Sequence, residues 1–145
     1  MALILADAGA DAMLAGTGST FAAAFNNGWI KIYDGTPPTT ANAAATGTLL
    51  VGDGRFPAVA FPNAPTNVVG VGRRITAGTM ASDNGADAGG TPTYARLLKQ
   101  DGVTVIAQCT VSVAGGAGDM QIDQVPIVQN APINFISLTI TMPTT

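Results

Sequence analysis

The chain has 145 residues, of which 47% are hydrophobic and only 10% are charged, and its formal net charge is −3. It contains six Lys and Arg residues that form no stripe, which argues against nucleic-acid binding because affinity for phosphates rests on clustered cations. There is no His and only one Cys, so Ser-His-Asp catalysis and an intramolecular disulfide are both excluded. The length suits a single domain spanning residues 1–145.

The low charge bears on how the chain associates. Ordinary globular chains are about 25% charged, and charge keeps proteins apart in solution. We therefore expect part of the neutral surface to be covered by a partner, and a homo-oligomer is one such arrangement. The alternative is a neutral surface that stays soluble by itself.

No apolar run approaches the roughly 20 residues of a transmembrane helix, and the N-terminus lacks the basic region of a signal peptide, so no membrane association is expected.

The N-terminal part is predicted to be helical over residues 2–25. Ala10, Leu14, Phe21 and Phe25 recur at spacings typical of a helix face. Glycines at positions 9, 16 and 18 interrupt this pattern, each at a cost of about 1 kcal/mol in a helix interior. The sequence therefore predicts one interrupted helix or two short ones, ended by Asn and Gly at 26–28.

The pattern then changes to period two, which is typical of strands. Residues 29–33 place Ile30 and Ile32 on one face, with Trp29, Lys31 and Tyr33 on the other. A turn with two prolines follows, and a second strand is expected from residue 46 onward.

The clearest hairpin joins residues 93–100 to residues 103–113 through Asp101 and Gly102. An Asp-Gly pair between two alternating runs is a strong hairpin signal. In the second strand, Cys109 is expected on an apolar face with Val103, Val105, Ala107, Val111 and Val113.

Another strand is predicted at residues 134–142, with Ile136, Leu138, Ile140 and Met142 on one face. Weaker strands are expected near 56–61, 67–75, 119–122 and 125–129. Short strands at this spacing favour a mainly β fold, an antiparallel sandwich or barrel. We predict a β-sandwich (jelly-roll or Ig-like) over residues 28–145, preceded by an N-terminal helical segment over residues 1–27.

The candidate chemical groups each have a structural explanation. Cys109 has no His to activate it and lies in the apolar phase of a strand, so a buried structural thiol is expected. Residues 83–87 place Asp83, Asn84 and Asp87 where a calcium ion could bind, but the spacing misses the EF-hand pattern, and Asp, Asn and Gly are ordinary turn residues. Residues 115–119 resemble part of a calcium-binding nonapeptide only once.

Other motifs are equally incomplete. Residues 16–21 and 70–75 begin like dinucleotide loops, but both lack the third glycine and a βαβ context. Two Asp residues could pair for glycosidase chemistry, although the Asp residues fall mainly at turns. Trp29 and Tyr33 on one strand face could stack on a sugar ring, or could serve packing. No catalytic, cofactor-binding or metal-ligating residue is predicted.

The order of several blocks resembles a family of small structural proteins from tailed bacteriophages. The blocks are GWIKIYDGTPP at 28–38, ATGTLL at 45–50, ADAGGT at 86–91 leading to YARL at 94–97, DGVTV at 101–105 and SLTITMP at 137–143. The family pattern has Trp-Phe before the Arg, where this chain has Thr93 and Tyr94. The resemblance implies a virion component and no enzyme.

The function expected from this resemblance is adhesive. The chain would be a capsid decoration or cement protein, made in the host cytoplasm, that binds the major capsid protein on the outside of the head shell. A tail or baseplate component is the first alternative. A carbohydrate- or receptor-binding module that uses Trp29 and Tyr33 is an alternative of another class.

Overall fold

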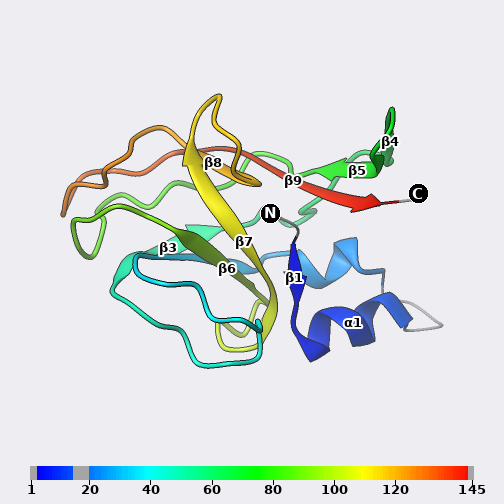
Figure 1. The fold of residues 1–145 in the computed structure, drawn as a ribbon, viewed down its shortest axis with the longest axis horizontal. Coiled ribbons are helices and arrows are strands. Elements are labelled where there is room, and N and C mark those ends of the chain that lie inside the picture. Colours follow the sequence, from blue (N-terminus) through cyan, green and yellow to red (C-terminus); the bar gives the residue numbers. More distant parts are fainter. Residues whose placement is uncertain (1–2, 15–19, 144–145) are drawn as a thin grey trace.

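The computed structural model describes residues 3–14 and 20–143. Nine strands form one sheet, accompanied by the short α-helix α1 (Asp7–Leu14) and the 3-10 helix η1 (Ala22–Phe25) (Figure 1). The strands in chain order are β1 (Ile4–Leu5), β2 (Trp29–Tyr33), β3 (Leu49–Arg55), β4 (Thr66–Val68), β5 (Gly72–Thr76), β6 (Tyr94–Leu98), β7 (Val105–Val113), β8 (Met120–Ile122) and β9 (Phe135–Pro143). The protein is therefore mainly β, as the period-two pattern predicts.

The sheet runs in the order β3-β2-β6-β7-β8-β9-β5-β4, and β1 also pairs with β7. Within the described residues, β3 and β4 do not pair with each other, so the sheet is not a closed barrel. All neighbours are antiparallel except β7 and β8, which corrects the expectation of a purely antiparallel architecture. Parallel pairing requires the chain to double back after β7, and glycines permit this: Gly115 has a φ of +81°, and a Cβ at Gly118 would lie 2.6 Å from the Ser112 nitrogen.

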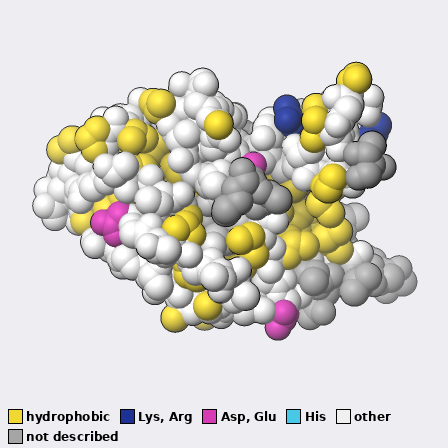
Figure 2. Space-filling view, viewed as in Figure 1, with side chains coloured by type: hydrophobic (Ala, Val, Ile, Leu, Met, Phe, Trp, Pro, Cys, Tyr) yellow, Lys and Arg dark blue, Asp and Glu magenta, His cyan; other side chains and the backbone are white. Residues whose placement is uncertain are grey.

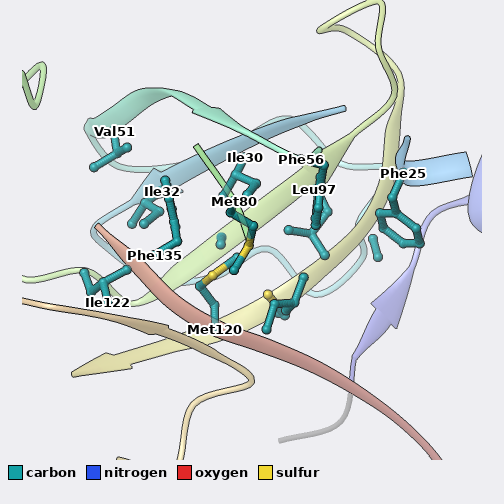
Figure 3. Packing of buried hydrophobic residues seen from close by; sticks show 14 of the residues in the cluster. Phe25, Ile30, Ile32, Val51, Phe56, Met80, Leu97, Met120, Ile122 and Phe135 are labelled. Atoms are coloured by element: carbon teal, nitrogen blue, oxygen red, sulfur yellow. The ribbon is translucent and has the colours of Figure 1, made fainter. Parts of the chain in front are cut away.

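The sheet is bent so far that β9 contacts β3. The ring of Phe135, at the start of β9, packs on Gly54 of β3, where an added Cβ would lie 2.4 Å from the ring. In the core, side chains of β2 and β6 such as Ile30 and Leu97 point toward Met120 of β8 (Figure 3). The main core thus lies between two halves of the same sheet.

A long loop at residues 34–48 adds a layer on the outside of β6 and β7. The Tyr94 hydroxyl donates to the carbonyl of Thr46 at 2.7 Å, and the Gln108 side chain donates to the carbonyl of Pro38 at 2.9 Å. Because this loop covers one face and the core covers the other, every residue of β6 is buried.

The strand predicted at residues 29–33 is confirmed as β2. Ile30 and Ile32 are fully buried in the core, while Trp29, Lys31 and Tyr33 on the opposite face are partly exposed. The alternation of apolar and polar side chains predicts correctly which residues are buried, because β2 contacts the core on one face only.

The predicted hairpin is confirmed as β6 and β7, which pair antiparallel. Its second strand begins at Val105 instead of Val103, because the Asp101 carboxylate accepts the backbone N–H groups of Val103 and Thr104 and holds both in the turn. The expected single apolar face of β7 is also incomplete. Ile106, on the opposite face from Cys109, is fully buried too.

The N-terminal segment explains the burial of Ile106. β1 pairs with β7, and Gly9 of α1 lies so close that a Cβ there would be 2.3 Å from the Ile106 carbonyl oxygen. The predicted helical segment is confirmed as α1 and η1 but is wrong at residues 4–5, which form β1. The glycines at 16 and 18 lie outside the described residues.

Two of the weaker predicted strands need correction. Residues 56–61 follow β3 as a loop, and their apolar residues are buried because Phe56 and Phe61 pack edge-on or tilted in a cluster with Phe25. Residues 67–75 form two strands, since Gly70 turns the chain with a φ of +74°. In residues 56–61, the aromatic and apolar side chains thus indicated burial in the core, and not a strand.

Of the other two weaker strands that were predicted, one is present and one is not. The strand near 119–122 is confirmed as β8. Residues 125–129 form no strand, and only Ile127 makes an isolated bridge, with Gly90. Pro126 cannot donate a ladder hydrogen bond, which accounts for the interruption.

The strand predicted at 134–142 is confirmed as β9, but its inward face differs at one end. The pairing with β8 shifts between Gln121 and Ile122, so Phe135 turns inward and Ile136 turns outward. A bulge of this kind changes the face on which a side chain lies, and period-two counting does not detect it.

Candidate functional site

A hollow with a volume of about 350 Å³ opens on the described surface. It lies beside the outer face of β2 and is lined by Trp29, Lys31, Asp53, Asp87 and Asp101. The ammonium of Lys31 donates to the Gly102 carbonyl at 3.2 Å, which ties β2 to the turn between β6 and β7.

The two aromatic side chains proposed to bind a sugar are already engaged. The Arg55 guanidinium lies 3.9 Å from the centroid of the Trp29 ring, a cation–π arrangement that covers one of its faces. Tyr33 stacks on Tyr94 with centroids 5.2 Å apart. Burial raises the pKa of Tyr33, Tyr94 raises it further, and Arg96 opposes the shift. Packing against neighbouring side chains therefore accounts for the positions of Trp29 and Tyr33 on this strand face.

The loop at residues 83–87 caps the edge of β3. One Asp83 carboxylate oxygen accepts the backbone N–H of Asp53 at 3.1 Å, and the other accepts that of Gly85 at 2.9 Å. Burial raises the pKa of Asp87, as do the charges of Asp83 and Asp53, while an N–H bond from Gly52 opposes the shift. Among the described residues no group of three or more acidic, Cys or His side chains is arranged to hold a metal ion.

Cys109 is fully buried in β7, where the sequence pattern places it. Burial raises the pKa of its thiol well above the ordinary range, and the charge of Asp119 adds to the shift. A thiol that is neutral and inaccessible is a poor nucleophile, so the position supports a structural role.

The glycine-rich motifs also have structural roles where they are described. Residues 70–75 form the turn and the strand of the β4–β5 hairpin, and residues 115–119 form the turn between β7 and β8. In that turn the Asp119 side chain accepts the Thr110 hydroxyl. Of residues 16–21, only 20 and 21 lie in the described part of the chain.

An apolar groove lies between the N-terminal segment and the β5–β9 end of the sheet, with a volume of about 230 Å³. Arg73 lies at its rim, and Figure 2 shows apolar side chains gathered there, in the hollow below the basic end of the molecule. Its apolar lining comprises Phe21, Ala22, Pro65, Ile75, Ile140 and Met142. Sequence reasoning missed the groove, because these residues come from four separate stretches and no local pattern links them.

A buried arginine was also missed. Arg96 of β6 is almost fully buried beneath the loop at residues 34–48, and its guanidinium donates to the Gln108 side chain at 3.4 Å. Its Nε has no hydrogen-bond partner among the described residues. The only sequence signal was its place in an otherwise apolar strand.

Comparison of the chain with protein-family models, with curated proteins and with solved structures finds no match. Among the described residues, no helix is long and apolar enough to cross a membrane.

Proposed function

We propose that the chain is a structural protein of a tailed-phage virion, which binds the outside of the head shell as a decoration or cement protein. The observation that supports this most is the apolar end formed by the loop after β8 and the start of β9. Val128 and Ile136 are 59% and 51% exposed there, Val125 is also exposed, and Asp123 is the one acidic residue of this loop. Figure 2 displays apolar side chains over this end. The order of sequence blocks supports the phage assignment.

Exposed apolar side chains with few charges suit a protein–protein contact. The core of such an interface is depleted in charge, and burying a Val or Ile side chain contributes about 1.5–3 kcal/mol. On a symmetric shell many copies bind side by side, so modest contacts add up through effective concentration.

The fold class we propose is a sandwich. Contact between β9 and β3, with the core between the two halves of the sheet, supports this interpretation, and a jelly-roll or Ig-like arrangement is our working hypothesis. The parallel pair β7–β8 is its departure from an ordinary antiparallel sandwich.

The two alternatives differ in the surface that they would use. A tail or baseplate subunit would bind virion proteins through the same apolar end. A carbohydrate- or receptor-binding module would use the hollow beside Trp29, and it is disfavoured because Arg55 already covers one face of that ring.

The test uses phage particles produced without this chain and then mixed with purified protein. We expect the wild-type protein to cosediment with heads and to raise the temperature at which they release DNA. Val128→Glu and Ile136→Glu should weaken binding at least tenfold, whereas Val59→Glu, a matched change at another exposed valine, should not. Equal binding by all variants would refute this contact, and binding to tails alone would favour the alternative.

A further inference from the structure

We propose that the apolar groove receives the Val103 turn of a second copy of this chain, with Asp101 of that copy pairing with Arg73, so that copies join head to tail. The inference concerns the contact of the chain with itself and does not depend on the shell.

The groove suits an occupant with an apolar tip and a negative charge beside it. Its lining is apolar, and exposed Arg73 at its rim donates only to the Pro65 carbonyl in the described structure. A guanidinium has five N–H donors, so most remain free to bind a carboxylate.

The turn between β6 and β7 has both features. Val103 is 79% exposed, and Asp101 lies two residues before it. The Asp101 carboxylate accepts the N–H groups of Val103 and Thr104 and the Thr104 hydroxyl, which fixes its position relative to the valine. These bonds, aided by Lys99, lower the pKa of Asp101 to about 2, so it is charged at neutral pH.

The turn is also rigid, which lowers the entropic cost of binding. Gly102 donates to the Lys99 carbonyl at 3.0 Å, and Lys99 donates to the Thr104 carbonyl at 2.9 Å. A carboxylate can accept about four hydrogen bonds, so Asp101 can bind a guanidinium without losing the bonds that hold the turn.

Charge distinguishes between the possible contacts of two copies. A two-fold contact of groove with groove would bring one Arg73 against the other, and the like charges would repel. Contact of groove with turn pairs opposite charges and buries an exposed valine. Val125 also has an acidic residue, Asp123, two positions before it, but Val125 is only 37% exposed against 79% for Val103, and both Asp123 oxygens accept hydrogen bonds from Asn134. Val69 lies on the same hairpin as Arg73, and Val59 has no carboxylate within five residues.

The turn and the groove lie at different edges of the molecule. Figure 1 shows the β6–β7 turn at the lower edge and β4 and β5 at the upper right. Each copy therefore offers one turn and one groove, and such a contact repeats until it closes into a ring or extends as a filament.

The experiment is sedimentation velocity of the purified full chain over a concentration series, with two variants that each disable one side of the contact. Val103→Ser removes the apolar tip, and Arg73→Glu reverses the charge at the groove. Both side chains are exposed, so folding should be retained, and circular dichroism checks this. We expect the wild type to form oligomers and each variant alone to associate at least tenfold more weakly.

Mixing the two variants is the decisive step. Arg73→Glu still has an intact turn and Val103→Ser still has an intact groove, so the mixture should form a 1:1 dimer and nothing larger. Val128→Ser, a matched change on the proposed shell-binding end, should oligomerise like the wild type. A monomeric wild type at several hundred micromolar, oligomers unaffected by Val103→Ser, or a mixture without the dimer would each overturn the proposal. Loss of shell binding with normal oligomers would instead count against the proposed function alone.

Discussion

Replacing Gly54 by alanine tests the contact that brings β9 onto β3. An added Cβ would lie 2.4 Å from Cζ of Phe135 and 3.0 Å from the Ile30 carbonyl oxygen, so the ring must move. Overpacking of this kind costs about 1–3 kcal/mol. For a chain of this size, each kcal/mol lowers Tm by roughly 3 °C, so we expect a fall of about 3–9 °C by calorimetry.

A double-mutant cycle attributes this loss to the ring. Phe135→Leu alone should cost about 1–2 kcal/mol from lost packing, and it should leave room for the methyl group that Gly54→Ala adds. The double variant should then be more stable than the sum of the two losses predicts, by about 1 kcal/mol or more. Gly85→Ala is the control, because its nearest neighbour atom would lie 3.9 Å away. If Gly54→Ala is harmless, or if Phe135→Leu does not relieve it, β9 does not pack on β3 as described.

The remaining predictions concern Cys109, Asp101 and the loop at residues 83–87. Cys109 should react slowly with iodoacetamide in the native state and quickly in urea, and Cys109→Ala should cost about 1 kcal/mol; fast native labelling would place the thiol at the surface. Because the folded pKa of Asp101 is about 2 and the unfolded value about 4, its stabilisation is present above pH 4 and is lost as the pH falls toward 2. Asp101→Asn should therefore flatten the acid side of a Tm-against-pH curve in that window, and an unchanged slope would contradict the carboxylate's role in the turn. EDTA should leave Tm and shell binding unchanged, whereas a fall in either would reopen the loop at residues 83–87 as a calcium site.

Local patterns predicted the parts of the fold that depend on local chemistry. Alternation identified β2 because only one of its faces meets the core, and the Asp101–Gly102 pair identified the β6–β7 hairpin. The burial of Cys109 followed from its phase in the strand.

Long-range packing accounts for the failures. The loop at residues 34–48 covers the outer face of β6, so no alternation remains there. Ile136 lies outward because of a bulge in the pairing with β8, which depends on a partner strand. The apolar groove is formed by η1, β5 and β9 together with Pro65, and only the folded chain brings these together.

Cryo-electron microscopy of the particles of the phage whose genome encodes this chain tests its proposed role most directly. We expect density for the β fold on the outside of the head shell, with Val128 and Ile136 facing the capsid subunits. Density for the chain at the tail or baseplate, or particles in which the chain is absent, would contradict the proposal that it decorates the head.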